Sequence, residues 1–196
     1  MSQGISERLC GEEEQQRAAA YNNAAQLRVA IPGIIESFDA NRQTVSVQPA
    51  ITENIQTGES EVKATKLPIL TDIPICFPRA GGYSITLPIH KGDECLLVFA
   101  DMCIDGWWQS GGIQDQMETR RHDLSDAFAV IGTTSQAKRL PGYSPDKMQI
   151  RADNNKVVME FDSGTGSIKI DCKGDFIVNA NGKVKINGSN GVNVGG

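Results

Sequence analysis

The chain has 196 residues, 39% of them hydrophobic, and carries a formal net charge of −5. This negative balance argues against a broad surface for nucleic acid or anionic membrane. No apolar run approaches the roughly 20 residues that a bilayer-spanning helix needs. Residues 1–10 lack the basic region and apolar core of a signal peptide, so we expect synthesis and assembly in a cytoplasm.

Five cysteines are scattered along the chain without a CxxC pair: Cys10, Cys76, Cys95, Cys103 and Cys172. In a cytoplasmic protein this pattern is typical of reduced, partly buried thiols. A zinc site has little support, because only His90 and His122 could join the sulfurs as ligands. We therefore expect no cofactor and no metal site.

Residues 1–31 are interpreted as a helical leader. The stretch from Glu12 to Ala30 is rich in Glu, Gln, Arg and Ala, its acidic residues come first, and Ser6 is placed to cap it. Pro32 then ends the helix. Large apolar residues are few, which leaves two interpretations: a solvated leader helix, or a docking helix for a partner subunit.

From residue 32 to residue 132 the pattern becomes all-β. Segment 44–52 alternates apolar and polar residues, and segment 94–100 is the most apolar run in the chain, so we expect it to form the central strand. Segments 33–42 and 62–70 read as further strands, and 73–78 as a Pro-flanked edge. Short strands at this spacing predict a small barrel of the oligonucleotide/oligosaccharide-binding (OB) type.

Residues 133–147 form a linker punctuated by Pro-Gly and Ser-Pro, and residues 148–196 form a periodic C-terminal region. From Gly166 the chain falls into rows of eight residues, with apolar residues in the third and fifth columns and Gly or Asn in the first. Apolar residues two apart indicate strands with one buried face, and a short fixed period indicates a fibre.

The seventh column, Cys172, Ala180, Gly188 and Gly196, loses side-chain volume towards the C-terminus. One ribbon of this kind cannot bury its own apolar face, so we predict a tapering fibre in which three chains intertwine as a trimeric β-helix or β-prism. The positions expected to face the trimer core or axis are Ile168, Ile170, Cys172, Phe176, Val178, Ala180, Val184, Ile186, Gly188, Val192 and Val194.

The sequence gives little support for a catalytic site. His122 and Asp123 are adjacent, but no serine or cysteine stands in a nucleophile context, and the turn predicted there would use their side chains to satisfy backbone groups. The acidic pairs Asp101/Asp105 and Asp123/Asp126 could imitate glycosidase carboxylates, yet solvated turns are the commoner role. We expect no enzyme activity and no catalytic residues.

Trp107 and Trp108 could form a stacking platform for bases or sugars, as some OB barrels do. With a negative net charge, we favour a packing role in which one indole lies on the barrel and the other forms an inter-subunit or hub contact.

The order of these parts resembles the baseplate central-spike proteins of contractile-tailed bacteriophages, also called membrane-piercing needles. The resemblance rests on Lys91-Gly-Asp-Glu94, Gly106-Trp-Trp108 and Arg121-His-Asp-Leu-Ser-Asp126, followed by the β-fibre. The stretch from Arg121 to Gly132 is similar to the family's strand pair that closes the OB barrel. The resemblance implies a structural virion component of the tail baseplate.

The same resemblance implies a homotrimer whose OB barrels seat in the tail hub. Its intertwined β-helix would point at the host outer envelope and puncture the membrane as the tail contracts. Spikes of this family often end in a His-x-His metal apex, whereas this chain has no histidine after His122. Three alternatives follow: a bare glycine-thin tip, a separate tip protein that caps Gly196, or a C-terminal truncation.

Two rival functions come from other classes. An OB-fold nucleic-acid-binding protein would need a basic groove and would bind with strong salt dependence. A tail-associated cell-wall hydrolase would need a further domain between barrel and fibre, and the linker at 133–147 is too short to hold one.

Overall fold

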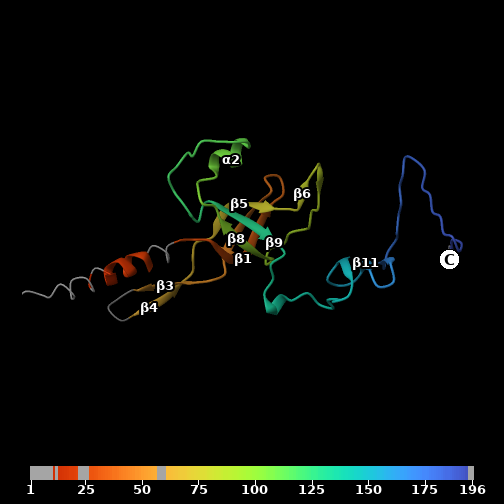
Figure 1. Ribbon diagram of the computed structural model, residues 1–196, viewed down its shortest axis with the longest axis horizontal. Coiled ribbons are helices and arrows are strands. Elements are labelled where there is room, and N and C mark those ends of the chain that lie inside the picture. The colour runs from red at the N-terminus through yellow and green to blue at the C-terminus, as the bar shows by residue number, and fades with distance from the viewer. Residues whose placement is uncertain (1–10, 12, 22–26, 57–60, 194–196) are drawn as a thin grey trace, which may run out of the picture. The chain divides into compact units, whose positions relative to one another are not determined.

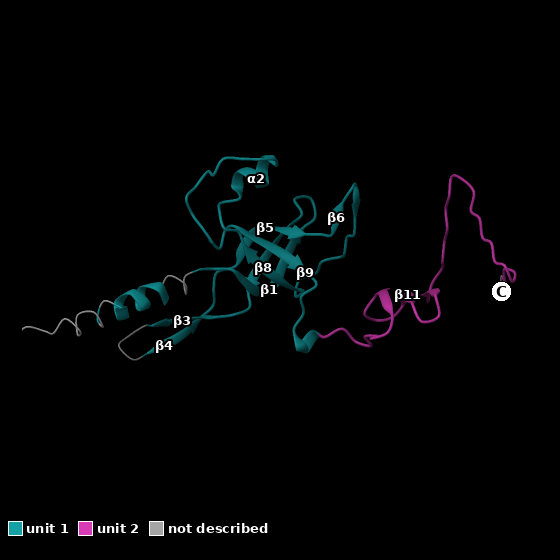
Figure 2. Ribbon diagram, in the orientation of Figure 1, with its two compact units in different colours: residues 1–138 teal, residues 139–196 magenta. Residues whose placement is uncertain are grey.

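The structure is a computed structural model that describes residues 11, 13–21, 27–56 and 61–193. Its chain divides into two compact units, Met1–Lys138 and Arg139–Gly196 (Figure 2). The first unit therefore continues past the predicted barrel boundary at residue 132 and takes in the first part of the predicted linker.

The first unit is built around a closed five-stranded barrel, which confirms the mainly β barrel expected from the sequence (Figure 1). Its strands are β1 (Ala30–Asp39), β2 (Thr44–Pro49), β5 (Leu70–Cys76), β8 (Glu94–Phe99) and β9 (Ala127–Ile131). They pair in the order β1-β2-β5-β9-β8, and β8 returns to β1 to close the barrel. All pairs are antiparallel except β5 with β9, which run parallel.

Alternating side chains of these strands fill the barrel. The residues of this buried core are Ile35, Val45, Val47, Leu70, Ile73, Cys95, Leu97, Phe99, Ala127 and Ala129. Strand β8 contributes Cys95, Leu97 and Phe99 at a spacing of two, as a strand with one buried face requires. Its neighbour β9 contributes only alanines, and Leu97 lies opposite Ala129, so a large residue meets a small one.

Gly33 sits where β1 pairs with both β2 and β8, opposite Pro49 and Cys95. A Cβ added at this glycine would collide with Val47 Cγ1 and would lie 3.2 Å from Leu97 Cδ1. The close approach of three strands at this point therefore depends on the absence of a side chain.

Two predicted strands take different places. Segment 62–70 enters the barrel only at Leu70, the first residue of β5; its first part, β4 (Val62–Thr65), pairs instead with β3 (Glu53–Gln56) in an exposed hairpin. Segment 73–78 was predicted as an edge, but β5 lies between β2 and β9 and buries Ile73 fully. A closed barrel has no edge, so Pro74 and Pro78 were a misleading signal.

The remaining short elements of the first unit lie between or after barrel strands. They are β6 (Arg79–Ala80) and β7 (Tyr83–Ser84), which form a hairpin, helix α2 (Asp105–Ser110) and the 3-10 turn η1 (Gln136–Lys138).

The leader helix is shorter than predicted. Residue 11 and residues 13–21 are helical, whereas residues 27–29 are irregular and Ala30 already belongs to β1. Tertiary pairing overrides helix propensity here: the amide of Phe99 donates to the Val29 carbonyl at 3.0 Å, and Ala30 pairs with Val98. Pro32 lies within a strand and ends no helix. Ser6, the predicted cap, lies outside the described residues.

The second unit contains one antiparallel sheet in the order β10-β11-β12, formed by Met148–Arg151, Val157–Asp162 and Ser167–Cys172. Residues 173–193, which the structure describes throughout, form no strand. Where a trimeric β-helix was expected over 148–196, the single chain therefore shows a three-stranded sheet and no β-helix among its described residues. Extended segments without neighbouring strands cannot form a sheet alone, and a sheet this small is marginal.

Candidate functional site

The sheet of the second unit has one apolar face. The cross-strand register places Phe161 opposite both Met148 and Ile168, and Met159 opposite both Ile150 and Ile170. Side chains two apart on a strand share a face, so these six apolar residues form two adjacent rows on one side. Met148 and Ile168 are each 65% exposed. In the single chain, the outer members of this apolar sheet face, Met148, Ile150, Ile168 and Ile170, are therefore exposed, and the central Met159 and Phe161 are half-buried.

The opposite face of the same sheet is charged and internally satisfied. Lys147 Nζ and Gln149 Nε2 each donate to the Glu160 carboxylate at 2.7 Å. The hydrogen bond to Glu160 raises the pKa of Lys147, and the bond from Lys147 is the main cause that lowers the pKa of Glu160. Lys169 lies 2.6 Å from Asp171 on this face. The charged face is complete without a partner, in contrast to the apolar sheet face.

The sequence-predicted axis residues are distributed unevenly over this unit. The structure brings three of them, Ile168, Ile170 and Cys172, onto one strand. Those from Phe176 to Val192 are exposed and unpaired in the single chain, and Val194 lies outside the described residues. From the sequence, Met148 was placed at the start of this region and Phe161 was interpreted as an early, loosely spaced rung. The face that they share with Met159 depends on strand register.

Gly188 has a local role that its column did not suggest. A Cβ added there would collide with the carbonyl oxygen of Gly191 in the same chain, because Gly191 N donates to Gly188 O at 3.1 Å and closes a turn. The small size of residue 188 is thus already required within one chain.

A second candidate surface is carried by residues 100–126, the segment between β8 and β9, which we call the β8–β9 excursion. An ion pair with a fully buried carboxylate holds it together next to the start of β9. Arg120 Nε lies 2.6 Å from Asp126 Oδ2, and Arg120 Nη2 donates to Asp126 Oδ1 at 3.1 Å and to Asp105 Oδ2 at 2.6 Å. Asp126 is fully buried and also accepts from the amide of Ile104 at 2.9 Å.

The same ion pair explains a cluster of possible metal ligands. Cys103, Asp105 and Asp126 present atoms within 4.8 Å of one another. Both carboxylates already bind the Arg120 guanidinium, whose hydrogen bond to Asp126 is the main cause that raises the pKa of Arg120. In this cluster, the negative charges of Asp105 and Asp126 are balanced by the positive charge of Arg120.

Trp107 and Trp108 lie on helix α2 of the excursion. Trp107 packs edge-to-face on Phe128 of β9, with ring centroids 5.8 Å apart, and its neighbour Trp108 is 6.4 Å away. The two indoles remain 47% and 38% exposed. One Trp therefore packs on the barrel, as predicted, while both keep an accessible face. Ile113 and Met117, which the sequence did not single out, are also exposed on this excursion.

His122 and the acidic residues near it occupy a turn that precedes β9. His122 Nδ1 lies 3.0 Å from the Arg28 carbonyl, and Nε2 lies 3.3 Å from Asp101, which Arg121 also contacts. Asp123 accepts from the Ser125 amide at 2.9 Å and from the Ser125 hydroxyl at 2.5 Å. These hydrogen bonds lower the pKa of Asp123. Each group thus has a structural partner that holds the turn or the incoming chain.

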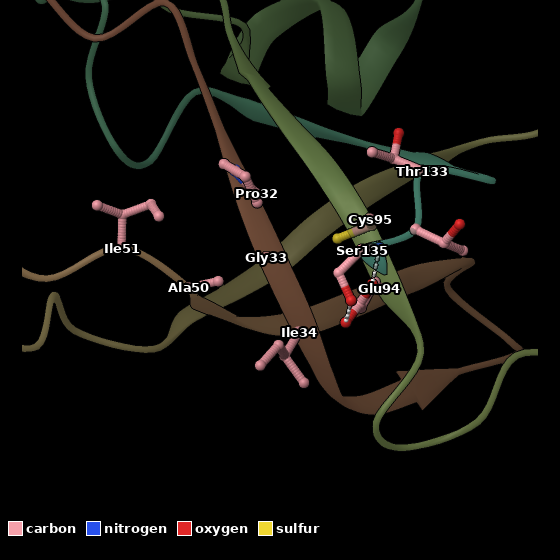
Figure 3. A pocket seen from close by; sticks show the side chains of 10 residues that line it. Pro32, Gly33, Ile34, Ala50, Ile51, Glu94, Cys95, Thr133 and Ser135 are labelled. Carbon is pink, nitrogen blue, oxygen red and sulfur yellow. Dashed lines mark hydrogen bonds between the residues drawn. The ribbon is translucent and has the colours of Figure 1, made fainter. Parts of the chain in front are cut away.

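A cavity of about 310 Å³ opens on the barrel wall, a feature that the sequence did not suggest (Figure 3). Gly33 and its neighbours in β1 line one side; Cys95 of β8 and residues 133–135 line the other. The lining is mostly apolar. Its polar residues include Glu94, whose carboxylate accepts from the Ser135 amide at 2.5 Å and from the Ser135 hydroxyl at 3.0 Å.

These Ser135 contacts also fix the path of the chain as it leaves the barrel. Lys138 Nζ donates to the carbonyl of Gly92, just before β8. The segment after β9 is thereby attached to the start of β8 at two points, which accounts for the extension of the first unit to Lys138.

No helix among the described residues is long and apolar enough to cross a membrane.

Residues 31–132 match the family described as Phage protein Gp138 N-terminal domain. The match spans more than half of the 196 residues and coincides with the barrel and its excursion, and the chain belongs to this family. Membership indicates a phage structural protein with a virion-associated location. A comparison with curated proteins found no match.

Proposed function

We propose that the chain is the central spike of a contractile phage tail baseplate. It assembles as a homotrimer, seats its barrels in the tail hub and directs its C-terminal unit at the host outer envelope, which it punctures when the tail contracts. The observation that carries the proposal is the uncovered apolar sheet face of the second unit, on a chain that belongs to a family of phage proteins.

The two faces of the sheet favour self-association over a solvated domain. A solvated sheet would expose polar residues on its outer side, yet Met148, Ile150, Ile168 and Ile170 all remain exposed beside a fully paired charged face. Burying a Met, Ile or Phe side chain contributes roughly 1.5–3 kcal/mol, so covering two rows of three would offset a substantial loss of chain entropy. A second and a third copy present the same rows to one another.

The octad rows extend the same alternation beyond the sheet. Phe176 and Val178, then Val184 and Ile186, repeat the spacing of Ile168 and Ile170 at intervals of eight residues. These side chains are exposed in one chain. Intertwining three chains would supply each extended segment with strand neighbours, and this removes both the exposed apolar column and the open strand edges.

The barrel supports the proposed hub attachment. With its strands taken in chain order, their neighbour order is first, second, third, fifth, fourth, with a parallel pair between the third and the fifth, and an OB barrel likewise has five strands. The accessible faces of Trp107 and Trp108 form the proposed hub or inter-subunit contact. Tryptophan is enriched at the energetic centres of protein interfaces, and the excursion that carries both is held by the Arg120–Asp126 pair.

Two measurements on the purified full-length chain test the proposal. Light scattering should give three times the mass of one chain, and negative-stain microscopy should show a rod with a wider head. Antibodies against the chain should label the baseplate end of tails of the phage that encodes it. A single-chain mass, or labelling on the capsid, would contradict the spike assignment. Salt-sensitive binding of single-stranded DNA by a monomer would favour the nucleic-acid-binding alternative.

A further inference from the structure

The segment after the last strand contains three Asn-Gly pairs: Asn181-Gly182, Asn187-Gly188 and Asn190-Gly191. All six residues are exposed and outside any strand. We propose that Asn181 and Asn187 are sites of spontaneous deamidation, and that a turn protects Asn190 from the same reaction.

The reaction needs no enzyme or cofactor. The backbone nitrogen of the following residue attacks the Asn side-chain carbonyl carbon; a C–N bond forms, the side-chain amide leaves as ammonia, and a five-membered succinimide results. Water then opens either carbonyl of the ring and gives aspartate or isoaspartate. Glycine favours the attack because it lacks a Cβ and its backbone reaches conformations closed to other residues.

The three sites differ in how their attacking nitrogen is held. Gly191 N donates to the Gly188 carbonyl at 3.1 Å, so this hydrogen bond must break before the nitrogen can reach Asn190. Within the part of the chain that the structure describes, no hydrogen bond engages the amides of Gly182 or Gly188. In the single chain, Asn181 and Asn187 therefore have a free attacking amide, and Asn190 has a restrained one.

The surroundings of Gly182 also allow a substitution that disturbs no neighbouring residue. Nothing lies within 4 Å of a Cβ added at Gly182, so Gly182→Ala fits without moving a neighbour. The same substitution at Gly188 would collide with Gly191 and disturb the turn. Gly182→Ala can therefore slow the attack on Asn181 while leaving the other two sites as internal references.

Deamidation would change the fibre in two ways, a consequence that rests on the proposed trimeric spike. Each event replaces a neutral amide with a carboxylate, and three copies would place three such charges around one shaft. Isoaspartate also routes the backbone through its Cβ, which adds an atom to the chain and breaks the two-residue alternation beyond it. Deamidated chains should therefore assemble into trimers less readily than unmodified chains.

The test is peptide mapping by mass spectrometry of the full-length protein after extended incubation in warm, mildly alkaline buffer. Asn181 and Asn187 should acquire the mass change of amide to acid, and Asn190 should lag behind both. In denaturant the difference should disappear, because the turn is lost. Gly182→Ala should remove most of the change at Asn181 and leave Asn187 unaffected.

Native Asn190 reacting as fast as Asn181, or an unreactive Asn181 or Asn187, would overturn the proposal. Light scattering on the same sample reports the oligomeric state independently. A trimer in which Asn181 does not react would refute the deamidation proposal and leave the spike proposal standing. A monomer in which Asn181 reacts would contradict the spike proposal and leave the deamidation proposal standing.

Discussion

Arg120 and Asp126 form a two-pronged ion pair at the entrance to strand β9, with the Asp126 carboxylate fully buried. Removing the arginine would leave that buried carboxylate without its main partner, a change that typically costs about 3–5 kcal/mol. We therefore expect Arg120→Met to lower the free energy of unfolding by that order in denaturant titrations.

A matched control is Arg121→Met. Arg121 pairs with the exposed Asp101, and exposed pairs contribute about 0–1 kcal/mol. The two neighbouring arginines should therefore differ clearly in their effect on unfolding. Equal effects would contradict the assignment of Arg120 as the residue that holds the β8–β9 excursion.

Gly33→Ala should destabilise the barrel, because the new Cβ collides with Val47 Cγ1. Overpacking of this kind costs about 1–3 kcal/mol. The double variant Gly33→Ala with Val47→Ala removes the colliding methyl group, so its loss of stability should be smaller than the sum of the two single losses. Additive losses in thermal and chemical unfolding would argue against the close approach of β1 and β2.

The contact of Glu94 with Ser135 should make the exit segment sensitive to pH. The hydrogen bond from the Ser135 amide lowers the pKa of Glu94 below its ordinary value. A depressed carboxyl pKa contributes stability above the unfolded value, about 4.3 for Glu, and that contribution is lost as the pH falls through the folded pKa. Hydrogen exchange at the Ser135 amide should therefore show protection at neutral pH that fades in acid.

Glu94→Gln provides the reference for this pH effect. The variant should show weaker protection of the Ser135 amide at neutral pH and a smaller change between neutral and acidic solution. Protection that falls equally in both proteins would assign the pH dependence to other groups.

Ile170 and Lys169 are adjacent on β12 but lie on opposite faces of the sheet. If the apolar sheet face is the contact between copies, Ile170→Ser should weaken the trimer, while Lys169→Ser should leave its mass unchanged. The wild-type oligomer and the Lys169 variant should both resist SDS without boiling, and the Ile170 variant should run as a single chain. The reverse result would place the contact on the charged face.

Ala180→Val tests whether the seventh column faces a common axis. Substitution of Gly188 cannot do so, since a side chain there already collides within one chain. Ala180 is exposed in the single chain, so valine has room unless copies of this position meet. We expect Ala180→Val to lower the melting temperature of the trimer through overpacking. An unchanged melting temperature would refute the axial assignment.

Much of the barrel could be predicted from the sequence because alternation reports burial directly. Strand β8 stood out as the most apolar run, and β2 as the most regular alternation. The place of β5 was missed, since the prolines near Ile73 indicate an edge unless the sheet closes, and closure depends on its long-range pairing with β9. The helix was extended too far for a similar reason: Val29 and Ala30 are recruited by β8, and local propensity does not contain that contact.

The candidate sites were predictable in part. Spacing alone selected Ile168 and Ile170, but their neighbours Met159 and Phe161 depend on strand register, which the irregular spacing before Gly166 conceals. The Trp pair was recognisable from its residue types. Arg120 was not, because its role is set by the buried Asp126 six residues later, and a turn folds the two together.

The attachment of Ser135 and Lys138 to the start of β8 has a mechanical consequence. A pull or push that enters the first unit along the chain at Lys138 reaches β8 through Gly92 and Glu94 before it reaches the end of β9. Two neighbouring strands then share the load, and the hydrogen bonds between them are not peeled apart one at a time. The barrel should therefore respond to such a force as a unit, because β8 and β9 carry it together.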